Sequence, residues 1–309
     1  MQLVAYGAQD IYLTGNPQIT FFKVVYRRHT NFAMESISQT FNGTVAASSS
    51  VTATISRNGD LVGRMYLEHN ATGVLTATSD DNYGHSIIDY VDLEIGGQRI
   101  DKQFGHWMEV WAELTEVNPT GAFTDSTAGM TNGTLFQMNA CAGGVNATAT
   151  IPGLLHIPLQ FWFCRNPGLA LPLIALQYHE VKVKVAFTDQ LNQANANLWV
   201  DYIYLDTDER RRFAQVSHEY LIEQVQHESH SGGSMTLNFN HPVKELIWAG
   251  TAIADTGRAT PVAVGTGTYQ LKLNGHDRFA ARDYRYFTRT QVWQHHTGYG
   301  SVSIADSVA

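Results

Sequence analysis

The sequence predicts an all-β protein made of two β-sandwiches in tandem, with short capping helices. Three observations support this class: short runs in which apolar and polar residues alternate, glycine and asparagine turns between those runs, and a weak internal repeat. Alternating runs at this density are typical of sandwiches. The 309 residues, 44% of them hydrophobic, are enough for two domain cores and exclude an intrinsically disordered chain.

The clearest strand signal is a hairpin in the first third of the chain. Residues 89–95 alternate in polarity, so that Val91, Leu93 and Ile95 share one face. Two glycines, Gly96-Gly97, follow and predict a tight turn, after which residues 98–102 return as the second strand. The same alternation predicts further strands at 51–55, 61–67, 180–187 and 198–205, with an Asn58-Gly59 turn between the first two.

One segment carries helical periodicity. Residues 106–117 place apolar side chains at i, i+3, i+4 and i+7, and Asn118-Pro119 then ends the pattern. The residues of this stripe are Trp107, Val110, Trp111 and Leu114. We expect a helix that covers the open end of a sandwich. Residues 120–150 and 250–267 are rich in small and polar residues and predict long exposed loops.

The chain also repeats itself. Residues 93–97 (LEIGG) resemble residues 271–275 (LKLNG). Upstream, the expected strand–turn–strand at 55–67 has a counterpart at 237–248, which turns at Asn240-His241-Pro242 and is displaced by nearly the same offset. Two matches in the same order predict two related sandwiches. The seam between them falls at 206–226, which we interpret as a solvated linker because it contains the charged run DERRR.

The second repeat is shorter than the first. The first unit continues from Gly97 as far as the seam at Asp206, whereas the chain ends at Ala309, much sooner after Gly275. We therefore expect the second sandwich to lack strands that the first one has, and the chain to be truncated at its C-terminus. A sheet without its partner strands leaves unpaired edges.

Charge and cysteine content exclude several classes of protein. The net charge is −8 and no basic cluster stands out, which argues against direct binding of nucleic acid. Charged residues make up only 16% of the chain, so we expect much of the surface to be covered by neighbouring molecules. Two cysteines, Cys141 and Cys164, indicate reduced thiols rather than a disulfide framework. The N-terminus has no signal-peptide pattern.

No motif predicts a catalytic residue, a cofactor-binding residue or a metal ligand. His227 and His230 lie in a glycine-flanked segment, and His295-His296 has no third ligand at a matching spacing. Asp206 and Asp208 resemble the start of a calcium loop that does not continue. The acidic residues that could serve glycoside hydrolysis are Asp80, Asp81, Asp89, Asp92 and Glu94, of which Asp92 and Glu94 are interpreted as a solvated strand face.

Four Asn-x-Ser/Thr sequons occur in the chain. Because a chain rich in threonine and asparagine produces such triplets readily, we interpret them as polar loop residues. They are Asn42, Asn70, Asn132 and Asn146.

Six segments resemble the major capsid proteins of nucleocytoplasmic large DNA viruses, above all those of the algal-virus branch. They are QLVAYGAQDIYLTGNPQITFFKVVYRRHTNFAMESI, ISRNGDL, DLEIGGQRIDK, NPGLALPLIALQYHEVKVKV, WVDYIYLDTDERRRFAQVSHEYLIEQVQ and LNFNHPVKELIWA. The resemblance covers nearly the whole chain. It implies a tandem double jelly roll, that is, two eight-stranded β-sandwiches, the second incomplete here.

The repeat and the strand pattern predict a first jelly roll at 20–205, a linker at 206–226 and an incomplete second jelly roll at 227–309. The resemblance implies an N-terminal arm at 1–19 and a role. The role is that of a structural, non-enzymatic protein, made in the host cytoplasm, whose homotrimer forms pseudo-hexagonal capsomers of an icosahedral virion. The implied partners are neighbouring capsomers, minor capsid proteins and the internal viral membrane at the capsomer base, with no direct contact to nucleic acid.

Two alternatives remain open from the sequence. The first is a minor capsid or penton-type protein of the same virus class. The second is a lectin-like sandwich that binds carbohydrate, since many sandwiches of this kind bind sugars. An enzyme is the least favoured reading, because no catalytic motif is present.

Overall fold

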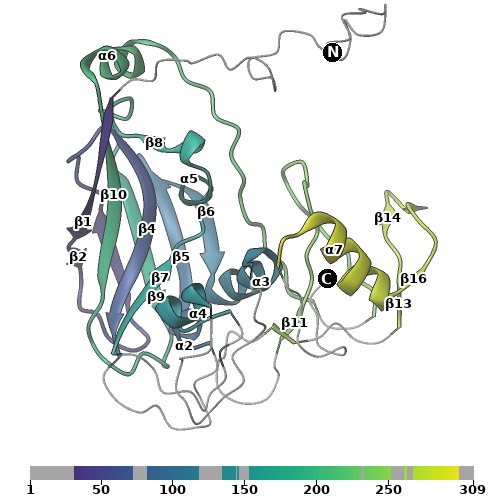
Figure 1. Cartoon of the computed structure of the whole chain (residues 1–309). Helices are drawn as coiled ribbons and strands as arrows, with labels where there is room; N and C mark the ends of the chain where they lie inside the picture. The colour runs from purple at the N-terminus through teal and green to yellow at the C-terminus, as the bar shows by residue number, and fades with distance from the viewer. Residues whose placement is uncertain are drawn as a thin grey trace, which may run out of the picture.

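Two antiparallel sheets of five strands each face one another in the first part of the chain (Figure 1). The computed structural model describes residues 31–71, 82–117, 134–143, 145, 153–230, 233–251, 261–262 and 267–298. In one sheet the order is β1-β10-β4-β7, with β8 also paired to β4; in the other it is β2-β3-β9-β5-β6. The strands are β1 (Phe32–Gln39), β2 (Phe41–Asn42), β3 (Ser50–Thr54), β4 (Leu61–Asn70), β5 (Ile88–Ile95), β6 (Gln98–Phe104), β7 (Leu154–Pro158), β8 (Leu171–Pro172), β9 (Val181–Phe187) and β10 (Asn197–Leu205).

The core lies between the sheets and follows from the alternation of the strands. In β9 the side chains of Val181, Val183 and Val185 are buried, while the lysines between them lie on the outer face. In β10 the side chains of Val200 and Tyr202 are fully buried. The strands predicted at 51–55, 61–67, 89–95, 98–102, 180–187 and 198–205 are all confirmed, with small differences at their ends.

Both sheets are closed by strands that are distant in sequence. β1 pairs with β10, so that Phe32 lies opposite Leu205. β3 pairs with β9, so that Val51 lies opposite Val185. An early strand of each sheet, β1 or β3, therefore pairs with a strand that comes much later in the chain, as in jelly-roll topologies.

Short helices lie against this sandwich. Near one end are α2 (Tyr83–Ser86), α3 (Gly105–Thr115) and α4 (Leu135–Ala140), whereas α5 (Trp162–Arg165) and the 3₁₀ turn η1 (Pro167–Leu169) lie beside β4 and β8 (Figure 1). α3 confirms the helix predicted at 106–117. α4 lies within the segment predicted as a loop; its capping box, in which Thr134 and Gln137 exchange hydrogen bonds, is a signal that the sequence contained.

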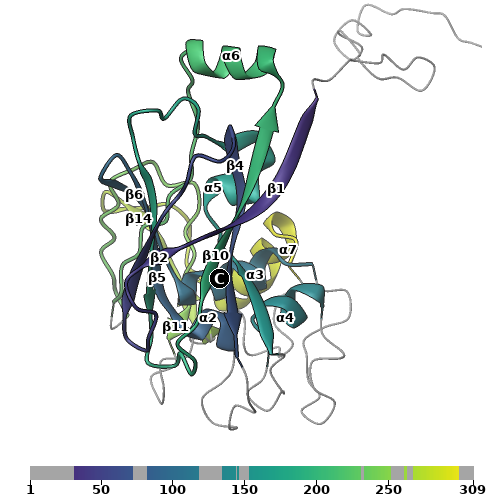
Figure 2. The ribbon, with the colours of Figure 1, turned by 90° about the vertical axis from the view of Figure 1, so that its left-hand side faces the viewer.

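The segment predicted as a solvated linker begins with a helix. α6 (Thr207–Gln215) starts at Asp206, whose side chain accepts a hydrogen bond from the backbone N–H of Thr207. Figure 2 shows α6 at the end of the sandwich where β10 ends and β1 begins. Arg210 ties the helix to Asp60, at 2.9 Å between Nε and Oδ1. The charged run therefore forms a helix that is anchored to the sandwich, and none of the helix residues is buried.

The strand–turn–strand predicted at 237–248 is wrong for the described structure: residues 233–249 are extended or irregular and pair with no strand in the described ranges. The first sandwich supplies the physical reason, because β3 pairs with β2 and β9 and β9 comes late in the chain. Among the described residues after α6, no strand takes the place beside this segment that β9 has beside β3.

The later hairpin reproduces the earlier one. β14 (Lys272–Leu273) pairs with β15 (His276–Asp277), and Leu273 lies opposite His276 as Ile95 lies opposite Gln98 in β5–β6. Both turns need positive φ at two residues, 61° and 83° at the two glycines and 51° and 81° at Asn274-Gly275. A helical segment follows in both units. The other elements here are β11 (Gly250–Thr251), β12 (Pro261–Val262), β13 (Thr268–Tyr269), β16 (Arg282–Asp283), the π-helix η2 (Tyr286–Gln291) and α7 (Val292–His295).

Some predictions fall outside the described residues. They concern the arm at 1–19, Asp80, Asp81, Asn132, Asn146 and most of the loops at 120–150 and 250–267. Among the helices of the described ranges, none combines the length and the apolar content that crossing a membrane requires.

Replacing Gly105 by alanine is expected to destabilise the first sandwich. A Cβ at this position would lie 2.2 Å from the carbonyl oxygen of Ile88 and 2.3 Å from that of His85, so the backbone has to shift. We expect a loss of at least about 2 kcal/mol in the free energy of unfolding, measured by urea denaturation. Gly233→Ala is the matched control, because a Cβ there meets nothing within 4 Å. Equal stability of the two variants would contradict the described junction between β6 and α3.

Candidate functional site

The histidines considered for metal binding lie apart. His227 and His230 are in the extended segment after α6, where the ring of His227 packs 4.9 Å from that of Phe104 and His230 pairs with Glu228 at 3.1 Å. His296 follows α7 and bonds to Glu245 at 2.5 Å. No group of three histidine, cysteine or acidic residues in the described ranges is placed to hold a metal ion.

Asp92 is buried, so its interpretation as part of a solvated face is wrong. Its side chain is 5% exposed, because β5 lies between β6 and β9 and Asp92 stands opposite Lys102 on one side and Lys184 on the other. Burial raises the pKa of Asp92, and the nearby positive charges of Lys102, Arg99 and Lys184 oppose that rise. Lys102 also lies over the ring of Tyr90, with Nζ 3.7 Å from the ring centre.

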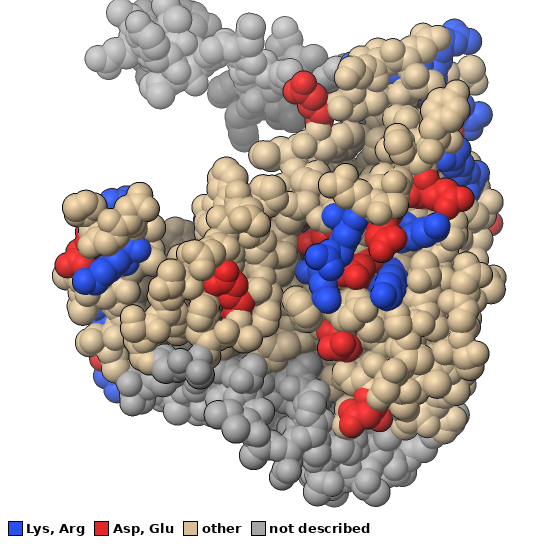
Figure 3. Space-filling model, turned by 180° about the vertical axis from the view of Figure 1, so that it is seen from behind, with Lys and Arg blue, Asp and Glu red and all other residues tan. Residues whose placement is uncertain are grey.

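These side chains form a row of alternating charges on the outer face of the second sheet, which we call the charged ladder. Its members are Asp92, Glu94, Arg99, Lys102, Lys182 and Lys184, and the uncharged ring of Tyr90 lies under Lys102. Figure 3 shows basic and acidic side chains gathered on this face, with uncharged surface around them. Each carboxylate lies opposite a basic residue on both neighbouring strands, which suits cross-strand stabilisation and not general acid–base catalysis.

Both cysteines are buried. Burial raises the pKa of the Cys164 thiol to about 12, so the thiolate that a nucleophile or a metal ligand requires does not form near neutral pH. The sequons Asn42 and Asn70 both lie at exposed positions.

A polar clasp joins the first sandwich to the chain that follows α6. The buried carboxylate of Asp101 accepts a hydrogen bond from the backbone N–H of Val225 at 3.0 Å. The side chain of Gln224 donates to the carbonyl of Ile100 at 2.5 Å. Burial raises the pKa of Asp101, and its hydrogen bonds partly oppose that rise. The clasp covers the edge of β6, which would otherwise be open.

An ion-pair chain extends the clasp. Arg165 pairs with Glu223 at 3.0 Å, and Glu223 also pairs with Lys244. The guanidinium of Arg165 lies 4.8 Å from the ring centre of Trp111. The clasp therefore connects α5, α3 and two segments beyond α6. No sequence motif marks these residues, because the partners are distant from one another in the chain.

α3 is shared by the two parts of the chain. Its buried Val110 and Leu114 form a small core with Val292 of α7. The backbone N–H of Gly298 donates to the carbonyl of Leu114 at 2.7 Å, and the ring of His296 meets Trp111 edge-on at 6.4 Å. The predicted capping helix thus also holds the second part in place.

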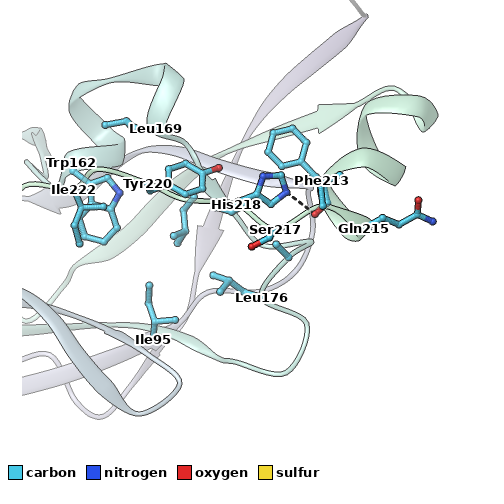
Figure 4. A pocket seen from close by; sticks show the side chains of 15 residues that line it. Ile95, Trp162, Leu169, Leu176, Phe213, Gln215, Ser217, His218, Tyr220 and Ile222 are labelled. Atoms are coloured by element: carbon cyan, nitrogen blue, oxygen red, sulfur yellow. Dashed lines mark hydrogen bonds between the residues drawn. The ribbon is translucent and has the colours of Figure 1, made fainter.

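A cavity of about 440 Å³ lies between α6 and the end of the sandwich (Figure 4). Its walls are mostly apolar, and His218 is held over Phe213 by a 2.9 Å hydrogen bond to the Phe213 carbonyl. Among the described lining residues no acid, base and nucleophile converge, so the cavity offers no catalytic arrangement.

Comparisons with known proteins point to one family. The family described as "Major capsid protein N-terminus" matches residues 20–206, and the one described as "Large eukaryotic DNA virus major capsid protein" matches residues 209–303. The chain is 53% identical to the major capsid protein of Pyramimonas orientalis virus, over 96% of this chain and 75% of that protein. It is 41% identical to that of Paramecium bursaria Chlorella virus 1, over 95% and 77%.

A solved structure agrees with these relatives. A quasi-atomic model of the PBCV-1 virus capsid superposes with a TM-score of 0.73 at 34% identity, covering 94% of this chain and 80% of that one. This similarity confirms the predicted fold class, a tandem double jelly roll. The relatives are longer than this chain, as the short second repeat led us to expect.

Removing the Asp101 carboxylate is expected to open the clasp. Asp101→Ala leaves the partly buried Val225 N–H without its acceptor, and a hydrogen bond of this kind contributes about 0.5–1.5 kcal/mol. We expect faster proteolysis within residues 220–230, measured by mass spectrometry of timed digests. Glu219→Ala, which removes an exposed carboxylate of the same segment, is the control and should leave the digestion rate unchanged. Identical digests for Asp101→Ala and the parent chain would refute the clasp.

The stability of the chain is expected to fall on mild acidification. Burial lowers the pKa of His106 below the ordinary 6.5, with nearby His227 adding to the effect and Glu109 opposing it. The unfolded chain then binds the proton first, so stability is full above pH 6.5 and is lost as the pH falls through the lowered pKa. When the pH is lowered from about 7.5 to 5.5, the melting temperature of His106→Gln should fall less than that of the parent. His241→Gln, at an exposed histidine, is the control; an unchanged loss in His106→Gln would contradict this assignment.

Proposed function

This chain belongs to the major capsid proteins of large eukaryotic DNA viruses, structural and non-enzymatic components of the virion shell, and from that premise we propose that it acts as a homotrimer forming one pseudo-hexagonal capsomer. Family membership decides between the readings that the sequence left open. The matched relatives are major capsid proteins, which disfavours both a minor or penton-type protein and a lectin-like sandwich.

The observation that carries the proposal is the repeat of the β5–β6 hairpin in β14–β15, with the same register and the same pair of positive-φ turn residues. A hexagonal lattice needs tiles with six similar sides. A chain with two related sandwiches supplies six units from three copies, so that threefold symmetry suffices. The matched ranges 20–206 and 209–303 support the division into jelly rolls at 20–205 and 227–309, joined by residues 206–226.

We further propose the contacts of this capsomer. Neighbouring capsomers would meet along the sandwich walls. Minor capsid proteins and the internal viral membrane would lie at the base, which we place at the α6 end because the chain enters β1 there and the expected arm at 1–19 precedes that strand. Direct binding of nucleic acid is not proposed, since the net charge is −8.

The trimer is tested by expressing the complete reading frame that contains these residues. Multi-angle light scattering should give three times the mass of one chain, and averaged electron micrographs should show particles with a six-sided outline. The variant Glu219→Gln, in the exposed part of 206–226, is the control and should assemble equally. A protein that stays monomeric at all accessible concentrations would overturn the proposal.

A further inference from the structure

The two outer faces of the first sandwich differ in chemistry. The face of β9-β5-β6 carries the charged ladder. The opposite face, formed by β1, β10 and β4, mixes polar residues with exposed or partly exposed apolar and aromatic ones, which are Phe32, Met34, Tyr66, Trp199 and Ile203. Its charged residues are Arg64, Glu68 and Asp201. Large apolar and aromatic side chains that lie together on an outer face indicate a surface that another protein covers.

An aromatic cluster marks the centre of this face. Tyr66 and Trp199 are direct cross-strand neighbours whose rings lie parallel, with centroids 6.3 Å apart and an interplanar angle of 8°. His156 of β7 meets Tyr66 edge-on at 5.4 Å. All three side chains are partly exposed. Tyrosine and tryptophan at the centre of a patch are the residues that contribute most to protein–protein binding.

β1 extends this face and leaves an open edge. It pairs with β10 on one side, and no described strand pairs with its other side. Its first five residues are exposed, and Phe32 and Met34 retain 67% and 58% of their accessible surface. The edge of β6 in the other sheet is covered by the clasp at Gln224 and Val225. In the described part of the chain, one sheet edge is therefore covered, whereas the outer edge of β1, eight residues long, is not.

We infer that this face, centred on Tyr66 and Trp199 and bordered by the free edge of β1, docks against a second copy of the chain. The inference rests on the proposed self-assembly and names the surface that performs it. Strands of eight to ten residues span about 30 Å, and three or four of them span about 15–20 Å. With the exposed edge of β1 added, the area of this face approaches the ~800 Å² that each partner buries in a stable interface. In a threefold ring the face meets a different surface of the next copy.

The test places one carboxylate on each outer face. Met34→Glu adds a charge at the exposed border of the proposed interface, and Thr54→Glu adds one at an exposed position of β3 on the opposite sheet. Analytical ultracentrifugation of the complete protein should show at least a tenfold weaker association for Met34→Glu and an unchanged one for Thr54→Glu. Equal melting temperatures of the two variants establish that both fold.

A second measurement needs no variant. Hydrogen–deuterium exchange of the parent protein should show the outward-facing amides of β1 protected in the oligomer and unprotected after dilution to monomer. If the parent assembles while Met34→Glu assembles equally well and β1 stays unprotected, the inference is wrong and the proposed trimer stands. If the parent does not assemble at any concentration, the proposed function itself fails.

Discussion

The pairing of early strands with late ones is the constraint on which this structure depends. β1 is held by β10 and β3 by β9, so neither sheet of the first sandwich is complete until the late strands β9 and β10 have been added. Backbone groups left unpaired in a sheet cost free energy, and the apolar inner faces need both sheets. The same rule explains the later segment 233–249, whose extended residues find no partner strand in the described ranges.

The second part of the chain is therefore held by contacts other than a complete sheet. α3 provides the apolar contact through Val110, Leu114 and Val292, and the clasp provides the polar one through Asp101 and Glu223. Both use surfaces of the first sandwich that would otherwise be exposed: the outer side of a capping helix and the edge of β6. The first sandwich thus provides the surfaces against which the following residues pack.

The sequence predicted what depends on local pattern. Strand alternation, the stripe of α3 and the paired turns of the two hairpins are properties of short windows, and the structure contains them. It did not predict burial set by neighbouring strands: Asp92 is polar and alternates outward, yet Lys102 and Lys184 cover it. The sequence could not predict the clasp either, because Asp101 and Val225 are far apart in the chain and only the fold brings them together. α4 could have been found from its capping box.

The hairpins also show how a repeat can keep its shape and change its chemistry. Glu94 lies opposite Arg99 in the first unit, and Lys272 lies opposite Asp277 in the second, so the cross-strand pair is retained with its polarity reversed. Either order of charges stabilises the hairpin, since attraction does not depend on which strand carries the cation. The two orders differ in the field they present to a neighbour. In the proposed trimer, the order of the two charges would then alternate among the six similar units, so that two adjoining sides would differ although their backbones match.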